Sequence, residues 1–343
     1  MEKDTRHTEP MITVLSGGVG GARFLQGVQR LLERSGHTDR AGITVIANTG
    51  DDIWIHGLKV CPDLDTVMYT LGKGIDTERG WGRTDESWRV LDELKTYGVE
   101  PTWFGLGDRD LATHLVRTEM MAAGYPLSRV TEALCVRWQP GVRLLPMTDD
   151  RVETHVVIDD PADGERRAVH FQEYWIRHQA SVPAHAVVPI GIEDAEPAPG
   201  VIEAIETADI VLLPPSNPVV SIGTILGVPG IREALRSTSA PVVGVSGIIG
   251  GDHVRGMARQ LLEALDVPVS AAAVAERYGS RTSPDSPDGI LDGWLIDSSD
   301  AAEVARVEAA GIRCRAVPLW MTDHDATADM AAAAFDLVGV PVP

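Results

Sequence analysis

The sequence predicts an α/β protein of the Rossmann-like type: a mainly parallel sheet between two layers of helices (αβα), with an inserted helical cap. Three observations support this. Short runs of apolar and β-branched residues recur along the chain, segments with apolar residues at helical spacing alternate with them, and polar or glycine-rich residues follow most runs directly. Because the carboxyl ends of parallel strands meet at one edge of a sheet, we expect a ligand site there.

The chain length and the net charge exclude several classes of protein. The chain has 343 residues, enough for a large core, and we expect residues 11–343 to form a single α/β domain behind a disordered leader at residues 1–10. A formal net charge of −20 argues against nucleic acid or an anionic membrane as the main partner. The sequence has no signal-peptide pattern and no run of apolar residues long enough to span a bilayer, which predicts a cytoplasmic protein.

The first unit is a strand over residues 12–15, a glycine-rich turn and a helix. The glycines of this turn are Gly17, Gly18, Gly20 and Gly21. Glycines let a backbone approach an anion closely, and a helix N-terminus offers unpaired N–H groups, so the turn is typical of phosphate binding. A tight turn without a ligand is the alternative. Arg23 stands where a dinucleotide fingerprint needs its third glycine, and no Gly-Lys-Ser/Thr follows, which disfavours standard NAD(P) and P-loop sites.

Acidic residues follow the second strand, predicted over residues 43–47. Asn48, Asp51 and Asp52 come directly after it, and a short hairpin arm is expected over residues 53–60. Asp63 and Asp65 then lie in the first turn of a helix opened by proline. Clustered carboxylates suit a hard divalent cation. A solvated turn and a helix cap are the alternatives for these two pairs.

A mainly helical segment at about residues 81–138 interrupts the β/α alternation, and we expect it to cover the site as a cap. Its predicted helices lie at about residues 84–95, 107–121 and 127–137. The second helix carries Asp108, Arg109 and His114 at or near its start, as candidate substrate contacts. A solvated charged face explains these residues equally well.

The remaining units continue the pattern. A further acidic pair follows Thr148, and a hairpin is predicted from residues 152–158 and 168–175. His155 and His170 on that hairpin are expected to be structural. A buried strand over residues 208–213 leads into a proline-rich loop, and its polar residues, Ser216, Asn217 and Ser221, suit recognition of a base or a phosphate. Further strands at residues 241–245, 293–297 and 312–319 and helices at about 253–265 and 325–337 complete the chain.

Six motifs follow one another along the chain: Ser-Gly-Gly-Val-Gly-Gly from residue 16, Asn-Thr-Gly-Asp-Asp from 48, Pro-Asp-Leu-Asp-Thr from 62, Leu-Gly-Asp-Arg-Asp from 106, Leu-Pro-Met-Thr-Asp-Asp from 145 and Pro-Ser-Asn-Pro from 215. Their order resembles the 2-phospho-L-lactate transferase family of coenzyme F420 biosynthesis, and its bacterial, phosphoenolpyruvate-using branch most closely. The resemblance spans nearly the whole chain. It implies a magnesium-dependent phosphotransferase, expected as a homodimer.

The resemblance also implies the reaction. A guanosine diphosphate-activated three-carbon acid donates an enolpyruvyl-phosphate (or phospholactyl) group to the ribityl hydroxyl of the deazaflavin Fo, giving dehydro-F420-0 (or F420-0) and GMP. A nucleotide-sugar-binding regulatory protein of the same superfamily and an NAD(P) oxidoreductase remain as alternatives.

Each candidate residue then has an expected role. Catalysis is assigned to Asp65, Asp52 and Asp63. Magnesium is assigned to Asp51, Asp52 and Asp63. Acceptor contacts are assigned to Asn48, Asp65, Asp108, Arg109, His114 and Thr148. Nucleotide contacts are assigned to Gly17, Gly18, Gly20, Gly21, Ser216, Asn217 and Ser221. Asp65 is the first choice for contact with the ribityl chain.

Overall fold

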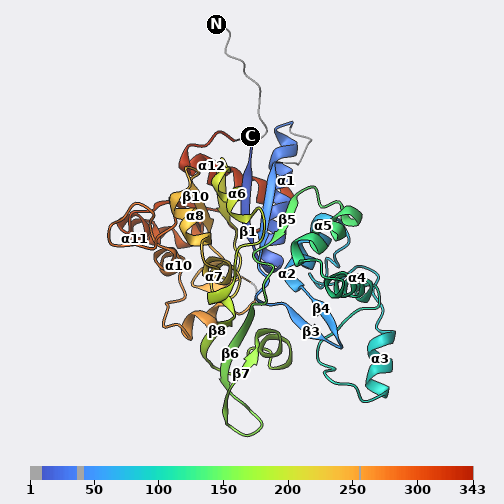
Figure 1. Ribbon diagram of the computed structural model, residues 1–343. Helices are drawn as coiled ribbons and strands as arrows, with labels where there is room; N and C mark the ends of the chain where they lie inside the picture. Colours follow the sequence, from blue (N-terminus) through green and yellow to red (C-terminus); the bar gives the residue numbers. More distant parts are fainter. Residues whose placement is uncertain (1–9, 37–41, 255, 343) are drawn as a thin grey trace.

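A seven-stranded parallel sheet forms the centre of the computed structural model, which describes residues 10–36, 42–254 and 256–342 (Figure 1). The strands, in spatial order, are β14 (Arg313–Val317), β13 (Gly293–Asp297), β10 (Val242–Val245), β9 (Ile210–Leu213), β1 (Ile12–Ser16), β2 (Ile43–Ala47) and β5 (Arg143–Pro146). Every neighbouring pair is parallel. This confirms the predicted fold class. The leader predicted for residues 1–10 lies outside the described residues except for Pro10.

Helices cover both faces of this sheet. One face carries α1 (Gly18–Arg34), α2 (Pro62–Leu71), α5 (Leu127–Trp138) and α12 (His324–Val338). The other carries α6 (Val201–Glu206), α7 (Ile222–Gly227), α8 (Ile231–Ser237), α9 (Ala258–Glu263), α10 (Ala271–Tyr278) and α11 (Val304–Ala309). Successive strand residues point to opposite faces, so Val14 packs in one apolar core and Leu15 in the other. Full burial of such a side chain contributes about 1.5–3 kcal/mol.

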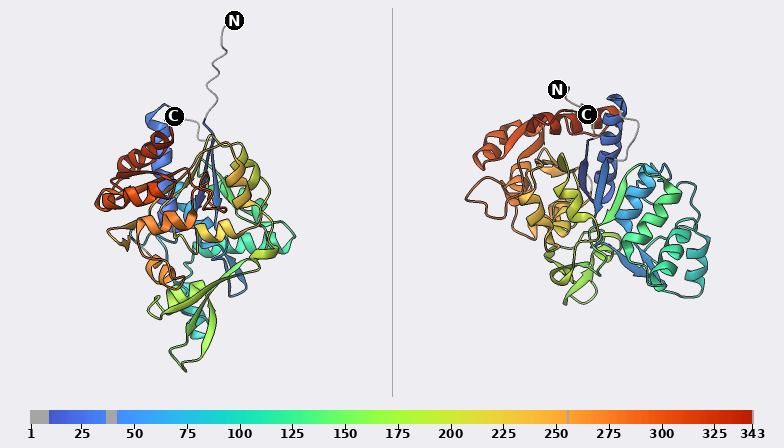
Figure 2. Two further views of the ribbon diagram at one scale, coloured as in Figure 1. Left: turned by 90° about the vertical axis from the view of Figure 1, so that its left-hand side faces the viewer. Right: turned by 45° about the horizontal axis from the view of Figure 1, so that its top comes forward.

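Smaller elements extend from the carboxyl edge of the sheet. They are the hairpin β3 (Ile53–Ile55) and β4 (Leu58–Val60), the three-stranded sheet β7 (Arg166–His170), β6 (Glu153–Asp159) and β8 (Ala184–Ile190), and the hairpin β11 (Ile248–Ile249) and β12 (Asp252–His253). Helix α4 (Asp110–Ala122) packs against β4, and α3 (Arg89–Thr96) precedes it in the chain. Figures 1 and 2 show α3, α4 and α5 together at one side of the molecule. That they cover a bound ligand stays a prediction. No helix of the described ranges has the length and apolarity needed to cross a membrane.

Several segments differ from the predicted secondary structure. The second arm of the predicted hairpin ends at His170, and η1 (Glu173–Arg177) is a π-helical turn that buries Tyr174, whose hydroxyl donates to the carbonyl of Val182 at 2.9 Å. Tertiary contacts override the strand propensity of this aromatic run. The helix expected from residue 253 begins only at Ala258, because β11–β12 occupies the chain before it. Strand β8 was not predicted, because Pro189 interrupts its pattern.

The helix expected from residue 84 begins at Arg89. Asp108 explains this start, because its carboxylate accepts the N–H groups of Arg89 at 3.2 Å and Val90 at 3.0 Å. Those are orphan donors of a first helical turn, so a residue distant in sequence caps the helix. The described residues also form two short 3₁₀ turns, η2 (Ile192–Asp194) and η3 (Ser298–Glu303).

Candidate active site

The strand-end loops singled out by the sequence meet beside the centre of the sheet. The strand order reverses between β1 and β9, and ligands of doubly wound sheets bind at such a switch point. The Ser216 hydroxyl, after β9, accepts the N–H of Gly17 at 3.2 Å and donates to the Gly17 carbonyl at 2.7 Å. The N–H of Asn48, after β2, donates to the carbonyl of Ser16 at 3.0 Å. Three loops are thus joined at one edge.

The glycines of the first loop allow close approach to other loops of the protein. A Cβ on Gly17 would lie 2.3 Å from Cβ of Ser221, and one on Gly20 would lie 2.5 Å from the carbonyl oxygen of Pro215. A Cβ on Gly21 would lie 2.8 Å from Oγ of Ser216. Any side chain at these positions would therefore separate the loop after β1 from the loop after β9.

Gly18 differs from its neighbours, because it begins α1 with a φ of +61° and its Cβ position is comparatively open, 3.9 Å from Oδ1 of Asp63. The first turn of α1 contains no acidic residue, and its N-cap residue, Gly17, has no side chain to cap it. Its N–H groups are the kind of donors that bind phosphate at a helix N-terminus.

The four carboxylates assigned to catalysis and magnesium are all buried. Asp51, Asp52, Asp63 and Asp65 are 4%, 1%, 6% and 5% exposed. A solvated turn, the alternative for Asp51 and Asp52, is therefore wrong. Carboxylates this deep need basic partners, hydrogen bonds, protonation or a metal ion. The four carboxylates are stabilised in different ways.

Asp63 and Asp51 have no basic partner among the ion pairs of the described residues. The Asn48 amide donates to Oδ2 of Asp63 at 2.9 Å, and its oxygen accepts the N–H of Gly50 at 2.9 Å. Burial raises the pKa of Asp63 to about 6, against the opposing hydrogen bonds from Asn48 and from the backbone of Gly18. Burial, and then the charge of Asp63, raise the pKa of Asp51 well above its ordinary value. Oδ1 of Asp51 is buried and makes no hydrogen bond within the described residues.

Asp52 lies against a buried lysine. Nζ of Lys59, on β4, is 3.1 Å from Oδ2 of Asp52. Burial raises the pKa of Asp52, while the Lys59 charge opposes that rise. For Lys59, burial favours the neutral amine, but the charge of Asp52 and its hydrogen bond, together with Cys61, outweigh burial, so the lysine pKa is raised.

His170 and Gln172 fix the backbone of the same loop. Nε2 of His170 lies 3.2 Å from the Asp52 carbonyl oxygen, and the Gln172 amide donates to the Asp51 carbonyl at 3.3 Å. The N–H of Gln172 donates to Nδ1 of His170, which places the ring proton on Nε2, facing Asp52. Burial lowers the pKa of His170 to about 4, so the ring is neutral at pH 7. These contacts fit the expected structural role of His170.

Asp65 is held by Arg117, a residue that sequence reasoning did not assign to the site. Nη1 of Arg117 donates to Oδ2 of Asp65 at 3.0 Å, and Nη2 donates to Oδ1. Burial opposes the charge of Arg117, but the Asp65 carboxylate raises its pKa further. Nδ1 of His114 lies 3.2 Å from Nη1 of Arg117, and its Nε2 lies 3.4 Å from Oδ2 of Asp110. The Tyr69 hydroxyl donates to Oδ1 of Asp110 at 2.5 Å.

This network extends from α2 to α4. Its members contact one another, but Nε of Arg117 is buried without a hydrogen bond to any described residue. Arg117 and His114 are each 1% exposed, so the solvated helix face considered for this segment is wrong here. The sequence did contain a signal, since Arg109, Thr113 and Arg117 recur at helical spacing on one face. It did not show which end of that face is buried. Catalysis by Asp65 stays a prediction, but both of its oxygens are engaged by the guanidinium.

The other candidate site residues make hydrogen bonds within the protein. Asp108 caps α3 and accepts the Ser87 hydroxyl at 2.6 Å. The Arg109 side chain is half exposed and donates to the carbonyl of Thr84 at 3.2 Å. Thr148 donates to the carbonyl of Glu196 at 2.5 Å. Oδ1 of Asn217 accepts the N–H of Val219 at 2.9 Å, which shapes the proline-rich loop. Their contacts with substrate stay predictions.

A small cavity lies beyond the carboxyl ends of β9 and β10. It has a volume of about 30 Å³ and is lined by the proline-rich loop together with His253, Tyr278, Trp294 and other residues. Ser216 and Asn217 are among the lining residues, so the loop that touches Gly17 on one side borders this cavity as well.

The residues present fit a magnesium ion that is completed by substrate. In the described ranges, no three side chains of His, Cys, Asp or Glu are arranged as a metal cage. Magnesium is commonly held by one or two carboxylates together with waters and substrate phosphates. Asp51 and Asp63 supply such carboxylates, with Oδ1 of Asp51 unpaired among the described residues.

Comparisons with known proteins identify the family of the chain. The family model described as 2-phospho-L-lactate transferase CofD matches residues 12–332. The chain is 64% identical over 326 residues to a phosphoenolpyruvate transferase of Streptomyces griseus, covering 95% of this chain and 98% of that one. It is 57% identical over 336 residues to a phosphoenolpyruvate transferase of Mycobacterium tuberculosis, covering 96% and 99%.

A solved structure shares the fold. A UPF0052-family protein from Bacillus halodurans has a TM-score of 0.58 and 17% identity, covering 96% of this chain and 99% of that one. The resemblance seen in the six sequence motifs is confirmed over the whole matched region. The chain belongs to the 2-phospho-L-lactate transferase (CofD) family and is a transferase of coenzyme F420 biosynthesis.

Proposed function

We propose that this enzyme transfers an enolpyruvyl-phosphate group from enolpyruvyl-diphosphoguanosine to the terminal ribityl hydroxyl of Fo, releasing GMP and forming dehydro-F420-0. The observation that carries the proposal is the position of Asp63, whose Oδ1 lies 3.9 Å from the Cβ position of Gly18 at the start of α1. A phosphate-binding helix terminus thus faces buried carboxylates. The names of the relatives support the phosphoenolpyruvate-derived donor over the phospholactyl one.

The reaction needs one bond to form and one to break. The ribityl oxygen bonds to the phosphorus that carries the enolpyruvyl group, and the bond from that phosphorus to the oxygen of GMP breaks, so GMP leaves with the electron pair. The hydroxyl proton passes to a carboxylate of the site. We assign that role to the oxygen of Asp63 or Asp51 that does not bind the metal, because Lys59 pairs with Asp52 and Arg117 pairs with Asp65.

The other groups of the site bind the donor and neutralise its charge. The N–H groups at the start of α1 bind the diphosphate, and the loop from Pro215 to Ser221 orients the guanosine. Magnesium held by Asp51 and Asp63 would neutralise the diphosphate charge that develops during transfer. The Asn48 amide keeps Asp63 oriented toward that position.

Incubation of the purified protein with Fo, the synthetic donor and Mg²⁺ tests the proposal. We expect GMP and the transferred product in equal amounts, with no product from Asp51→Asn. A phospholactyl donor in parallel decides the three-carbon acid, since its product carries two more hydrogen atoms. Failure with both donors, by a protein with native thermal unfolding, would refute the function.

A further inference from the structure

Two acidic side chains join the starts of α3 and α4 reciprocally. Glu86, which precedes α3, accepts the N–H of Arg109 at 2.6 Å and the N–H of Asp110 at 3.2 Å, where α4 begins. Asp108, which precedes α4, accepts two N–H groups in the first turn of α3. Each carboxylate therefore caps the helix that follows the other one, and a negative charge at a helix N-terminus is favourable. We call Glu86 and Asp108 together the clasp.

The backbone around the clasp leaves room for the Glu86 side chain. A Cβ on Gly107 would lie 2.0 Å from both Cγ and Cδ of Glu86, so the carboxylate reaches α4 only because this position is glycine. The N–H of Asp108 donates to the carbonyl of Ser87 at 2.8 Å, and the Ser87 hydroxyl donates to the Asp108 carboxylate at 2.6 Å. The two segments thus hold each other through side chains and backbone alike.

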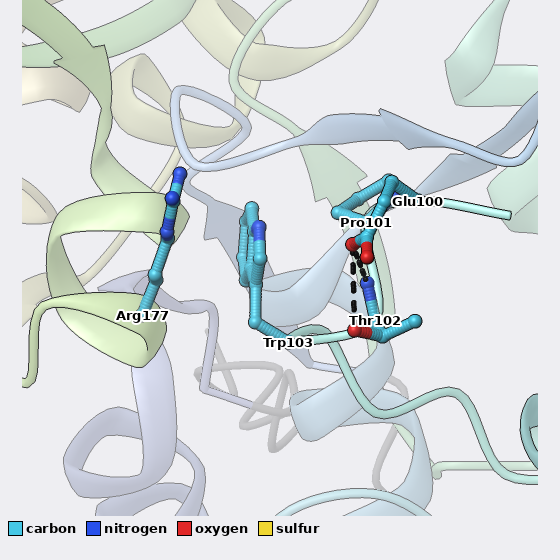
Figure 3. Close-up of a pocket in the computed structure, with 5 residues that line it drawn as sticks. All are labelled: Glu100, Pro101, Thr102, Trp103 and Arg177. Carbon is cyan, nitrogen blue, oxygen red and sulfur yellow. Dashed lines mark hydrogen bonds between the residues drawn. The ribbon is translucent and has the colours of Figure 1, made fainter. Parts of the chain in front are cut away.

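The connection from α3 to α4 is also held in its middle. The Glu100 carboxylate accepts the N–H of Thr102 at 2.9 Å, and both residues line an open hollow together with Trp103 and Arg177 (Figure 3). Trp103 packs edge-on against Phe104, with ring centroids 5.9 Å apart. Phe104 is buried in a small apolar cluster with side chains of β3 and β4. The clasp therefore closes a connection that is already packed on the β3–β4 hairpin.

The start of α4 is joined to α2 by side chains. Glu86 holds the N–H of Asp110, and the Asp110 carboxylate accepts the hydroxyl of Tyr69, a residue of α2 that is 1% exposed. Two turns further along α4, Arg117 binds Asp65 in the first turn of α2. Because α4 contacts α2 at both places, a shift of its start must either break one contact or move the turn that carries Asp65.

We propose that Glu86 is a positioning residue for the transfer reaction. Together with Asp108 it fixes where α4 begins, and α4 in turn orients the first turn of α2. The proposal rests on the proposed function, because Asp63 in that turn is one of the carboxylates assigned to the metal and the proton. Glu86 contacts no reacting group, so its loss acts on the chemical step through α4. The start of α1, which binds the diphosphate, lies outside this path.

Steady-state kinetics of Glu86→Ala and Glu86→Gln test this role. We expect Glu86→Ala to lower kcat about tenfold, since a small misplacement of catalytic groups is costly. The KM for the donor should change less than about threefold, because the groups that bind the diphosphate stay in place. Glu86→Gln keeps one acceptor oxygen and should retain more activity than Glu86→Ala.

Ser270→Ala is the matched control for the loss of a helix cap. The Ser270 hydroxyl accepts the N–H of Ala273 at 3.1 Å and caps α10, which has no contact of this kind with α2 or α4 among the described residues. Both Ser270→Ala and Glu86→Ala should lower Tm by a few degrees. Only Glu86→Ala should lower kcat. Equal kcat values for these two variants would overturn the proposal.

Gly107→Ala displaces the same carboxylate by another route. Gly107 does not have a positive φ, so its backbone accepts alanine, but the added Cβ would occupy the space of the Glu86 side chain. This variant should lower kcat as Glu86→Ala does. In the double variant the shortened side chain no longer meets the added Cβ, and kcat should equal that of Glu86→Ala alone. Losses that multiply in the double variant would contradict the clasp.

Hydrogen–deuterium exchange separates the clasp from the proposed function, because it needs no substrate. Glu86→Ala removes the acceptor of the Arg109 and Asp110 N–H groups only. If the clasp acts as one unit, exchange should also accelerate in the first turn of α3, which Asp108 caps, and in the first turn of α2. Faster exchange confined to the start of α4 would overturn the proposal. Coupled exchange in a protein that transfers nothing would refute the proposed function and keep the coupling of the clasp to α2.

Discussion

Arg117 binds both carboxylate oxygens of Asp65, and the two side chains are 1% and 6% exposed. The pair joins α4 to the first turn of α2, the turn that also carries Asp63. A buried ion pair contributes little compared with an apolar replacement, but breaking one side of it is costly. We therefore infer that this pair positions α2, and that its loss disturbs the acidic loop indirectly.

Arg117→Ala should destabilise the protein by about 3–5 kcal/mol, because it leaves the Asp65 carboxylate buried and uncompensated. Equilibrium unfolding in urea measures this. The double variant Asp65→Leu with Arg117→Met should recover most of the stability, since it removes both charges. Unchanged unfolding of Arg117→Ala would contradict the positioning role of this pair.

Asp63→Asn should stabilise the protein at neutral pH in the absence of divalent cations, while it abolishes transfer. The folded-state pKa of about 6 lies above the ordinary value of 3.8, so the stability contribution of this group is present below about pH 4 and is lost as pH rises through 6. The gain at pH 7 should be about 1–3 kcal/mol.

Thermal unfolding between pH 4 and 8 measures this difference, with the exposed Asp285→Asn as control. The wild type should lose stability relative to Asp63→Asn as pH rises through 6. A difference between the two proteins that is constant over this range would show that Asp63 titrates normally.

Magnesium should stabilise the wild type and leave Asp51→Asn and Asp63→Asn unaffected. A ligand at one hundred times its Kd stabilises the folded state by about 2.7 kcal/mol. Thermal unfolding with added MgCl₂ and GDP measures the shift, and Asp285→Asn should respond like the wild type. Equal stabilisation of all four proteins would place the metal elsewhere.

Gly17→Ala should destabilise the protein by about 2–3 kcal/mol and raise KM for the donor, because its Cβ would lie 2.3 Å from Cβ of Ser221. Gly18→Ala should cost about 1 kcal/mol, since only its φ of +61° is unfavourable. Adding Ser221→Gly to Gly17→Ala should restore part of the stability. Equal effects of the two single variants would contradict the close packing of these loops.

Local patterns were sufficient to predict much of the fold. The buried runs at β1, β2, β9 and β10 and the glycine turn after β1 follow from period and residue type alone. Strand order did not, because it depends on contacts across the whole chain. The π-turn at η1 and the strand β8 were missed, since tertiary packing and Pro189 override the local pattern there.

The motifs predicted which residues form the site better than they predicted how those residues are arranged. The six motifs named the acidic loop, but they did not show that Lys59 and Arg117 neutralise Asp52 and Asp65. Lys59 lies outside the motif that contains Asp52. Arg117 is distant in sequence from Asp65 and lies on a helix face that also suits solvent. Glu86 belongs to no motif, and only the folded chain places it against the start of α4.

The most direct test of the central claim is the stoichiometry of one reaction mixture. Fo, enolpyruvyl-diphosphoguanosine and Mg²⁺ are incubated with the wild type and with Asp51→Asn, and products are quantified by mass. We predict one GMP for each dehydro-F420-0 with the wild type, and neither product with the variant. Transfer by Asp51→Asn at the wild-type rate, or donor breakdown by the wild type without modification of Fo, would contradict the account.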